Sequence, residues 1–234
     1  MPKSFSLSLI IVSLALSLHA HAGLLDSAKS MKNSLDKAAN APVKVSVGKG
    51  ALQDNAGDIE KVFAAFKKKA GANPLMVYGA SIGSRGDAHI TYQSPYNADK
   101  LESLHFFKEE IQGKATKFTL TGINVKVEDN VFDFARVKLS AIPGLVQAAR
   151  EKTAQATKGN KTLGSSVKIV QLWAKGKPTQ VRIIVNMSSD DGKSTAAQIG
   201  DALDTLKDNP PPKGSTVGQL VADENGKFIE FRML

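Results

Sequence analysis

A glycine-serine-glycine motif is the first pattern in this chain that could carry catalysis. The run Gly79-Ala80-Ser81-Ile82-Gly83 fits GxSxG, in which a serine at a sharp turn between a strand and a helix attacks an acyl group. Residues 75–78 are typical of the strand, but residues 84–87 are typical of a turn and a second strand follows them. The required helix is missing, so we expect a glycine-rich hairpin with Ser81 at a strand end.

The histidines do not stand at the sequence positions expected of a catalytic partner for Ser81. Beyond residue 22 the chain has only His89 and His105, and both precede the place where the histidine of such hydrolases lies in the sequence. These two residues, in a chain without cysteine, cannot form a zinc site unless distant carboxylates join them. We therefore expect no catalytic residue, no metal and no cofactor, and a hydrolase stays open only as an alternative.

A second motif resembles the end of a phosphate-binding loop. Residues 191–195 (DGKST) follow a predicted strand and open a predicted helix, but the glycine that such a loop needs five residues before Gly192 is Met187 here. We interpret the motif as a strand-to-helix turn in which Ser194 or Thr195 caps the helix.

Positive charge gathers in the second half of the chain. Of the 31 Lys and Arg residues, seven lie within residues 143–177 together with a single acid, and the same stretch holds Trp173, the only tryptophan. Lysines attract an anionic ligand, and an indole adds apolar or stacking contact. The candidate binding residues are Lys158, Lys161, Lys168, Trp173, Lys175, Lys177 and Arg182. The alternative is a solvated basic surface with Trp173 in the core.

The first 22 residues have the build of a secretory signal peptide. One lysine precedes an apolar stretch over residues 5–18, and Ala20-His21-Ala22 places small residues where signal peptidase cuts. The stretch is shorter than the roughly 20 residues that span a bilayer, so we expect cleavage after Ala22 rather than a retained anchor. We expect a soluble, cysteine-free protein of the periplasm, or alternatively a secreted one.

Helices and hairpins alternate along the remainder. Residues 23–57 are predicted to form an amphipathic helix and a connector. Helices are predicted at residues 58–70, 98–112, 143–156 and 194–207, the first capped by Asp58 and the second by Asn97. Strands are predicted at residues 75–81, 88–93, 117–127, 131–139, 167–174, 179–187, 216–222 and 227–233. The last two meet at Asn225-Gly226, the strongest hairpin signal in the chain.

This order indicates an α+β fold with helices packed on one face of antiparallel sheet. Short turns between consecutive strands leave no room for the crossovers of a parallel pair. The order αββαββ occurs twice, at residues 58–140 and 141–234, which we interpret as a tandem repeat of one unit.

We expect an exported non-enzymatic protein that binds a partner in the cell envelope, a protein or an anionic lipid or glycan. We expect no sequence-specific nucleic acid as partner and no membrane-spanning segment. A second hypothesis is a carrier of a small apolar or amphipathic ligand, lined by the aromatic residues Phe63, Phe66, Phe106, Phe107, Phe118, Phe132 and Phe134. A packed core is the other interpretation of these residues, and a cavity of roughly 300 Å³ would favour the carrier.

Overall fold

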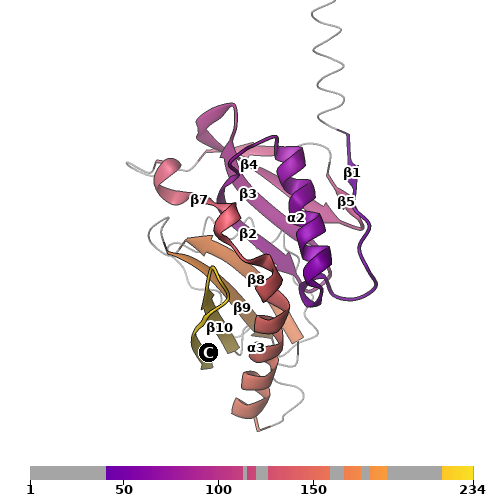
Figure 1. Ribbon diagram of the computed structural model, residues 1–234, viewed down its shortest axis with the longest axis vertical. Helices are drawn as coiled ribbons and strands as arrows, with labels where there is room; N and C mark the ends of the chain where they lie inside the picture. Colours follow the sequence, from indigo (N-terminus) through magenta and orange to yellow (C-terminus); the bar gives the residue numbers. More distant parts are fainter. Residues whose placement is uncertain are drawn as a thin grey trace, which may run out of the picture. The chain divides into compact units, whose positions relative to one another are not determined.

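One antiparallel sheet organises the part of the chain that the structure describes (Figure 1). The computed structural model describes residues 41–112, 115–119, 126–158, 166–174, 180–188 and 218–233. All of these except Ala41 belong to one compact unit. The fold is therefore α+β with antiparallel pairing, as the short turns in the sequence predict.

Nine of the described strands follow one another across the sheet. Their order is β1 (Val43–Lys44), β5 (Glu110–Ile111), β4 (Asn97–Phe107), β3 (Ala88–Ser94), β2 (Met76–Gly83), β8 (Ser166–Ala174), β9 (Val181–Ser188), β10 (Gly218–Asp223) and β11 (Phe228–Met233). Two short strands lie off this path, because β6 (Thr116–Phe118) pairs with β4 and β7 (Phe132–Asp133) pairs with β2. β2 is the first long strand of the first half of the chain, and β8 is the first long strand of the second half. These two strands are neighbours at the centre of the sheet.

Two helices, α2 (Ala56–Ala70) and α3 (Ile142–Ala156), lie on the same face of the sheet (Figure 1). Ile59, Val62, Phe63 and Phe66 recur at intervals of three and four residues, so they share one side of α2, and all four are buried. α3 has a proline in its first turn, where the missing N–H costs no hydrogen bond, and it packs on β8, β9 and β10.

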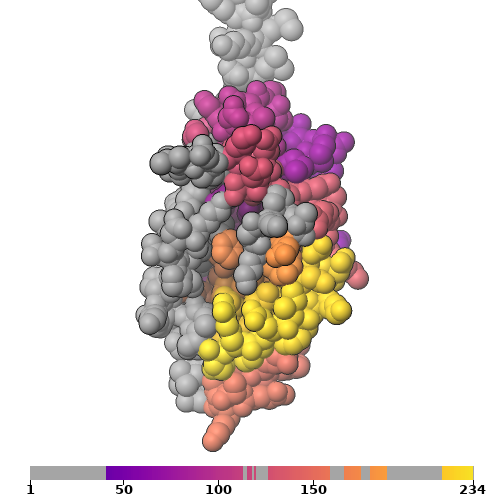
Figure 2. Space-filling model, turned by 90° about the vertical axis from the view of Figure 1, so that its left-hand side faces the viewer, coloured from indigo at the N-terminus to yellow at the C-terminus, as the bar shows by residue number. Residues whose placement is uncertain are grey.

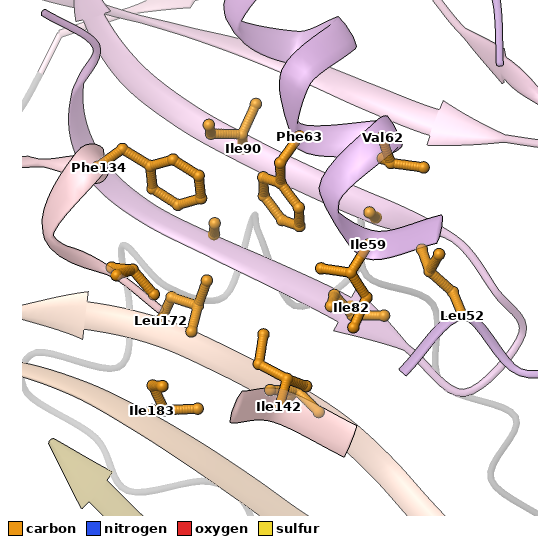
Figure 3. Close-up of a cluster of buried hydrophobic side chains, with 14 of the residues drawn as sticks. Leu52, Ile59, Val62, Phe63, Ile82, Ile90, Phe134, Ile142, Leu172 and Ile183 are labelled. Carbon is orange, nitrogen blue, oxygen red and sulfur yellow. The ribbon is translucent and has the colours of Figure 1, made fainter. Parts of the chain in front are cut away.

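The main hydrophobic core lies between these helices and the sheet (Figure 3). In a strand, alternate side chains face opposite sides, so Ile82 of β2, Ile90 of β3 and Leu172 of β8 all point toward the helices. The Phe63 ring stacks on Phe134, with their centroids 5.1 Å apart. Each fully buried side chain of this size stabilises the fold by about 1.5–3 kcal/mol.

The pairing of β2 with β8 joins the two halves of the chain. In this register Gly79 lies opposite Trp173, Ser81 opposite Gln171, and Gly83 opposite Ile169. These residues alternate with the helix-facing ones, so they all lie on the other face of the sheet.

The helix predicted at residues 98–112 was wrong, because this segment forms β4 and β5, and the order αββαββ expected for residues 58–140 is therefore wrong as well. Its apolar residues are spaced three and four apart, but pairing with β3 along the length of β4 overrides that local pattern. Lys108 and Glu109, with φ of 49° and 62°, make the tight turn that folds β5 back on β4. Asn97 is consequently no helix cap but the first residue of β4, opposite Ser94.

Two further predictions were wrong in part. The strands expected at residues 117–127 and 131–139 shrink to β6 and β7, and short 3-10 turns occupy residues 128–130, 134–136 and 139–141.

Asp58 does not cap the first helix, which begins at Ala56. The cap is Asn55, whose side-chain oxygen accepts the N–H of Asp58 at 3.1 Å.

The other predicted elements within the described residues are confirmed, to within a few residues at their ends. They are the helices at 58–70 and 143–156, the strands at 75–81, 88–93, 167–174, 179–187, 216–222 and 227–233, and the turn at Asn225-Gly226. The predicted signal peptide, the amphipathic helix after it and the helix at 194–207 lie outside the described residues. Among the described helices none is long and apolar enough to cross a membrane.

Gly226 gives a test of the turn between β10 and β11. Its φ is 83°, and a Cβ there would lie 2.3 Å from the Cβ of Ala141. We expect Gly226→Ala to lower the free energy of unfolding by more than about 2 kcal/mol, because backbone strain and a clash add together. Gly71, with φ 64° but open space around it, is the matched control, and Gly71→Ala should cost only about 1 kcal/mol. If urea unfolding shows equal losses of stability for Gly226→Ala and Gly71→Ala, the close packing of Gly226 against Ala141 is contradicted.

Asp58 gives a test of how the segment before α2 is held. Its Oδ1 lies 2.9 Å from Lys61 Nζ and its Oδ2 accepts the Gly48 N–H at 2.7 Å, and these two contacts hold the pKa of Asp58 below its ordinary value of 3.8. The folded state thus prefers the charged carboxylate, so its contribution is present above pH 3.8 and is lost as the pH falls through the lower folded value. We expect Asp58→Asn to be less stable than wild type at neutral pH, with the difference closing below pH 3.8. A difference in urea midpoints that stays constant into that acid range would refute this.

Candidate functional site

Seven polar side chains cross the face of the sheet that points away from the helices, one from each of seven neighbouring strands. We call them the polar row. They are His105 of β4, His89 of β3, Ser81 of β2, Gln171 of β8, Asn186 of β9, Gln219 of β10 and Arg232 of β11.

The first part of the polar row follows the strand register directly. His105 lies opposite His89, His89 opposite Ser81, and Ser81 opposite Gln171. The two imidazole rings have centroids 6.4 Å apart. Side chains directly opposite one another have Cβ atoms about 4.5–5.5 Å apart, so this part of the row is continuous across four strands.

The second part of the polar row is a chain of hydrogen bonds. Asn186 Nδ2 donates to Gln171 Oε1 at 2.9 Å, Gln219 Nε2 donates to Asn186 Oδ1 at 2.8 Å, and Arg232 Nε donates to Gln219 Oε1 at 2.9 Å. A second guanidinium nitrogen of Arg232 donates to the same oxygen. All donors point the same way along the chain, so the charge of Arg232 polarises each bond in turn.

Most of the polar row is buried. Ser81 has no exposed surface, and His89, Gln171, Asn186 and Gln219 are each 4–7% exposed. Burying an amide costs free energy unless it is hydrogen-bonded, and Val or Ile would fill a covered strand position without that requirement. The amides are retained here with a directional network, so the row is a candidate for function rather than only for packing.

A buried carboxylate lies next to the histidine end of the row. Asp87 has no exposed surface, and its Oδ2 lies 3.6 Å from His105 Nε2, an ion pair when the imidazole is protonated. Hydroxyl, imidazole and carboxylate groups thus share one end of this face. Among the described residues, however, no three His, Asp or Glu side chains converge as metal ligands.

The structure corrects the expected position of Ser81. It lies in the middle of β2, which continues to Gly83, so it is neither at a strand end nor at a nucleophile elbow. His89 and His105 lie on adjacent strands, and their adjacency could not be predicted while His105 was assigned to a helix. Ser81 and Asp87 are both fully buried, which leaves the hydroxyl no open approach for an acyl substrate.

Of the predicted binding residues, the structure brings together Trp173 and Arg182. They lie directly opposite each other on β8 and β9, on the same face as the polar row. Lys168 is at the bulge five residues earlier in β8, about 16 Å away at the rise of an extended strand. Lys158 follows the end of α3 with φ 51°. Lys161, Lys175 and Lys177 lie outside the described residues.

Trp173 has a polar atom that the described residues do not satisfy. Its indole Nε1 is buried and has no hydrogen-bond partner among them. Arg182, opposite, donates from one guanidinium nitrogen to the Val181 carbonyl at 3.0 Å, and Asp223 lies opposite Arg182 on its other side. A buried indole N–H usually has a partner, so Trp173 marks a place where a ligand acceptor would fit.

The aromatic residues proposed to line a carrier cavity pack in the core. Five of them are buried, namely Phe63, Phe66, Phe106, Phe132 and Phe134. Phe107 is 39% exposed, and the side chain of Phe118 lies outside the described part. None of the seven lines the pocket of about 160 Å³ beside β1 and β5, whose walls are Lys44, Val45, Ser46, Lys108, Glu109 and Glu110.

A separate buried carboxylate, Glu102, serves the pairing of β3 with β4. It accepts hydrogen bonds from Ser94 Oγ at 2.7 Å and Tyr92 Oη at 3.1 Å. Burial, and then the negative charge of Glu102, raises the pKa of Tyr92 above its usual range. Both hydroxyls donate to the carboxylate, so this cluster has a structural explanation and is not part of the polar row.

Sequence reasoning missed most of the polar row, although a signal was present. In the runs ASI, AHI, VQL, VNM and GQL a single polar residue stands among small or apolar ones. Period-two alternation places that residue on the face away from the core. Aligning the residues into one row requires the register between strands distant in sequence, which local patterns do not provide.

A comparison with protein-family models, curated proteins and solved structures gives no match to this chain.

The amide chain predicts a non-additive response to substitution. Asn186→Leu removes the central link and leaves buried polar groups of Gln171 and Gln219 without their partner, which should cost about 2–4 kcal/mol in the free energy of unfolding. Changing Gln171, Asn186 and Gln219 together to Leu removes the unpaired groups as well. The triple variant should therefore cost less than the sum of the three single variants, and an additive result in urea unfolding would argue against a connected chain.

Proposed function

We propose that this protein is an exported, non-enzymatic binding protein of the cell envelope. Its working surface is the accessible part of the sheet face that carries the polar row, formed by Trp173, Arg182 and Arg232. The buried amides of the row hold Arg232 in position on that face. The observation that carries the proposal is the polar row itself, which puts preorganised hydrogen-bonding groups of seven strands on the face opposite the helices.

The chemistry of this face favours an anionic partner. Arg182 and Arg232 bring guanidinium groups, which bind carboxylate and phosphate through paired N–H donors. The Trp173 indole N–H adds a donor with no partner among the described residues. The formal net charge is +9, or +8 once residues 1–22 with Lys3 are removed, and it favours approach of a negatively charged partner at long range.

The proposed compartment rests on the N-terminal sequence. Cleavage after Ala22 would deliver the chain to the periplasm, with secretion as the alternative. The absence of cysteine agrees with a protein that is held by packing alone in an oxidising compartment.

We further propose that the chain arose by duplication of a unit in which one helix precedes four antiparallel strands. The described elements run α2-β2-β3-β4-β5 and then α3-β8-β9-β10-β11, apart from the short elements between β5 and α3, and residues 189–217 between β9 and β10 lie outside the described part. The first unit contributes the histidine and serine end of the polar row, and the second unit contributes the amide chain and Arg232. The binding face would then belong to both units.

Burial weighs against the two alternatives. A hydrolase would need Ser81 within reach of a substrate, whereas Ser81 and Asp87 have no exposed surface. A carrier would need a cavity lined by the aromatic residues, and five of these fill the core.

Photo-crosslinking in the exporting cell tests the proposal. We expect a benzoylphenylalanine in place of Trp173 to capture one partner, because the side chain lies on the binding face and stays aromatic. Arg182→Glu in the same chain should reduce the captured product about tenfold or more, since it reverses a charge beside the crosslinker. Gel shift and mass spectrometry of the product measure both effects.

The matched control is the same crosslinker in place of Tyr96, an aromatic residue that is 87% exposed in the turn between β3 and β4. It should capture little of that partner. If the two positions capture the same product equally, or position 173 captures nothing, the sheet face is not the binding surface.

A further inference from the structure

The outer edge of β11 carries an exposed apolar surface. β11 is the last strand in the sheet order, and within the described part of the chain it has a neighbour on one side only, β10. Phe228, Ile229 and Met233 are 43–46% exposed. Figure 2 shows the C-terminal hairpin, in yellow, at the surface. An exposed edge of this kind is a template for pairing with another strand.

The two faces of β11 differ in chemistry. Phe231 packs against the core on the helix side, and Met233, two residues further on, shares that side. Phe228 lies there as well, because it pairs with the buried Ala222 and Lys152 of α3 lies over its ring. Ile229 is the extra residue of a bulge between Phe228 and Glu230. Glu230 and Arg232 lie on the opposite side, the side of the polar row. The strand is thus amphipathic, with one negative and one positive residue flanking Phe231.

This arrangement is complementary to itself. In an antiparallel pair related by a two-fold axis at Phe231, Glu230 lies opposite the partner's Arg232, and Arg232 opposite the partner's Glu230. On the helix side the two Phe231 rings face each other. Opposite charges on one face and apolar pairs on the other are both favourable cross-strand contacts.

Neighbouring registers lack this match. A two-fold axis at Glu230 places like charges opposite each other, and an axis at Arg232 does the same with two arginines. Directly opposed like charges destabilise a strand pair. Of these three registers, the sequence of β11 therefore favours the one with the axis at Phe231.

We propose that β11 pairs with β11 of a second copy of this chain, forming a two-fold symmetric dimer with one continuous sheet. A two-fold contact of this type uses the same surface on both copies and closes on itself, so it stops at two. The polar rows of the two copies meet at the dimer axis through Arg232. This inference does not depend on the proposed function, although Arg232 belongs both to the polar row and to the edge. Glu230 lies outside the row, so Glu230→Arg is the variant that tests the edge alone.

Charge reversal tests the dimer. Sedimentation equilibrium of the purified wild-type chain should show a dimer at micromolar concentration. Glu230→Arg and Arg232→Glu each place like charges across the axis, so each should weaken dimerisation by at least about tenfold. The double variant, with both substitutions in one chain, restores opposite charges and should dimerise like wild type.

A mixture of the two single variants gives the sharpest outcome. Each chain then carries two like charges and meets two opposite ones in the other chain, so native mass spectrometry should show a mixed dimer of one copy each. Glu60→Arg and Lys100→Glu, on exposed residues away from β11, should leave the wild-type dimer unchanged. A monomeric wild type, single variants that dimerise normally, or a mixture that forms no mixed dimer would each overturn the proposal.

Discussion

The pairing of β2 with β8 is the contact on which the rest of this structure depends. It is the place where the two halves of the chain share one sheet, and its register puts Ser81 opposite Gln171 and Gly79 opposite Trp173. A shift by one residue would exchange the faces of every side chain beyond it, moving Ile82 out of the core and Ser81 into it. The hydrophobic core and the polar row are therefore fixed by the same register.

This register divides the sheet between two tasks. The side toward α2 and α3 is apolar and supplies the burial that holds the fold. The other side holds an amide chain that ends in Arg232, and Trp173 and Arg182 lie on the same side. Because buried apolar side chains on the helix side stabilise the fold, the other side can retain buried polar groups. In a sheet with only a structural role, apolar residues would occupy those positions. This is the physical basis for proposing that face as the binding surface.

The elements that depend on local sequence signals were predicted correctly. The hairpin at Asn225-Gly226 and the helix that opens at Pro143 follow from turn and first-turn chemistry within a few residues. Residues 98–112 were misassigned because helical spacing there competes with a strand pairing that only the tertiary structure supplies. The polar row was not predicted, because it also depends on strand pairing in the tertiary structure. It joins residues up to 151 positions apart in the sequence, from Ser81 to Arg232. The basic cluster around Trp173 stays a prediction, because Lys161, Lys175 and Lys177 lie outside the described residues.

The indole resonance of Trp173 offers the most direct measurement of the central claim, that the polar face of the sheet binds the partner. The chain has one tryptophan, so a ¹H–¹⁵N spectrum of the labelled protein contains one indole Nε1–H signal that needs no further assignment. In a titration with the partner captured by crosslinking, we predict that this signal shifts with the side-chain amides of Gln171, Asn186 and Gln219 while the backbone of α2 is unchanged. An unmoved indole signal, with shifts confined to α2 and α3, would contradict the account.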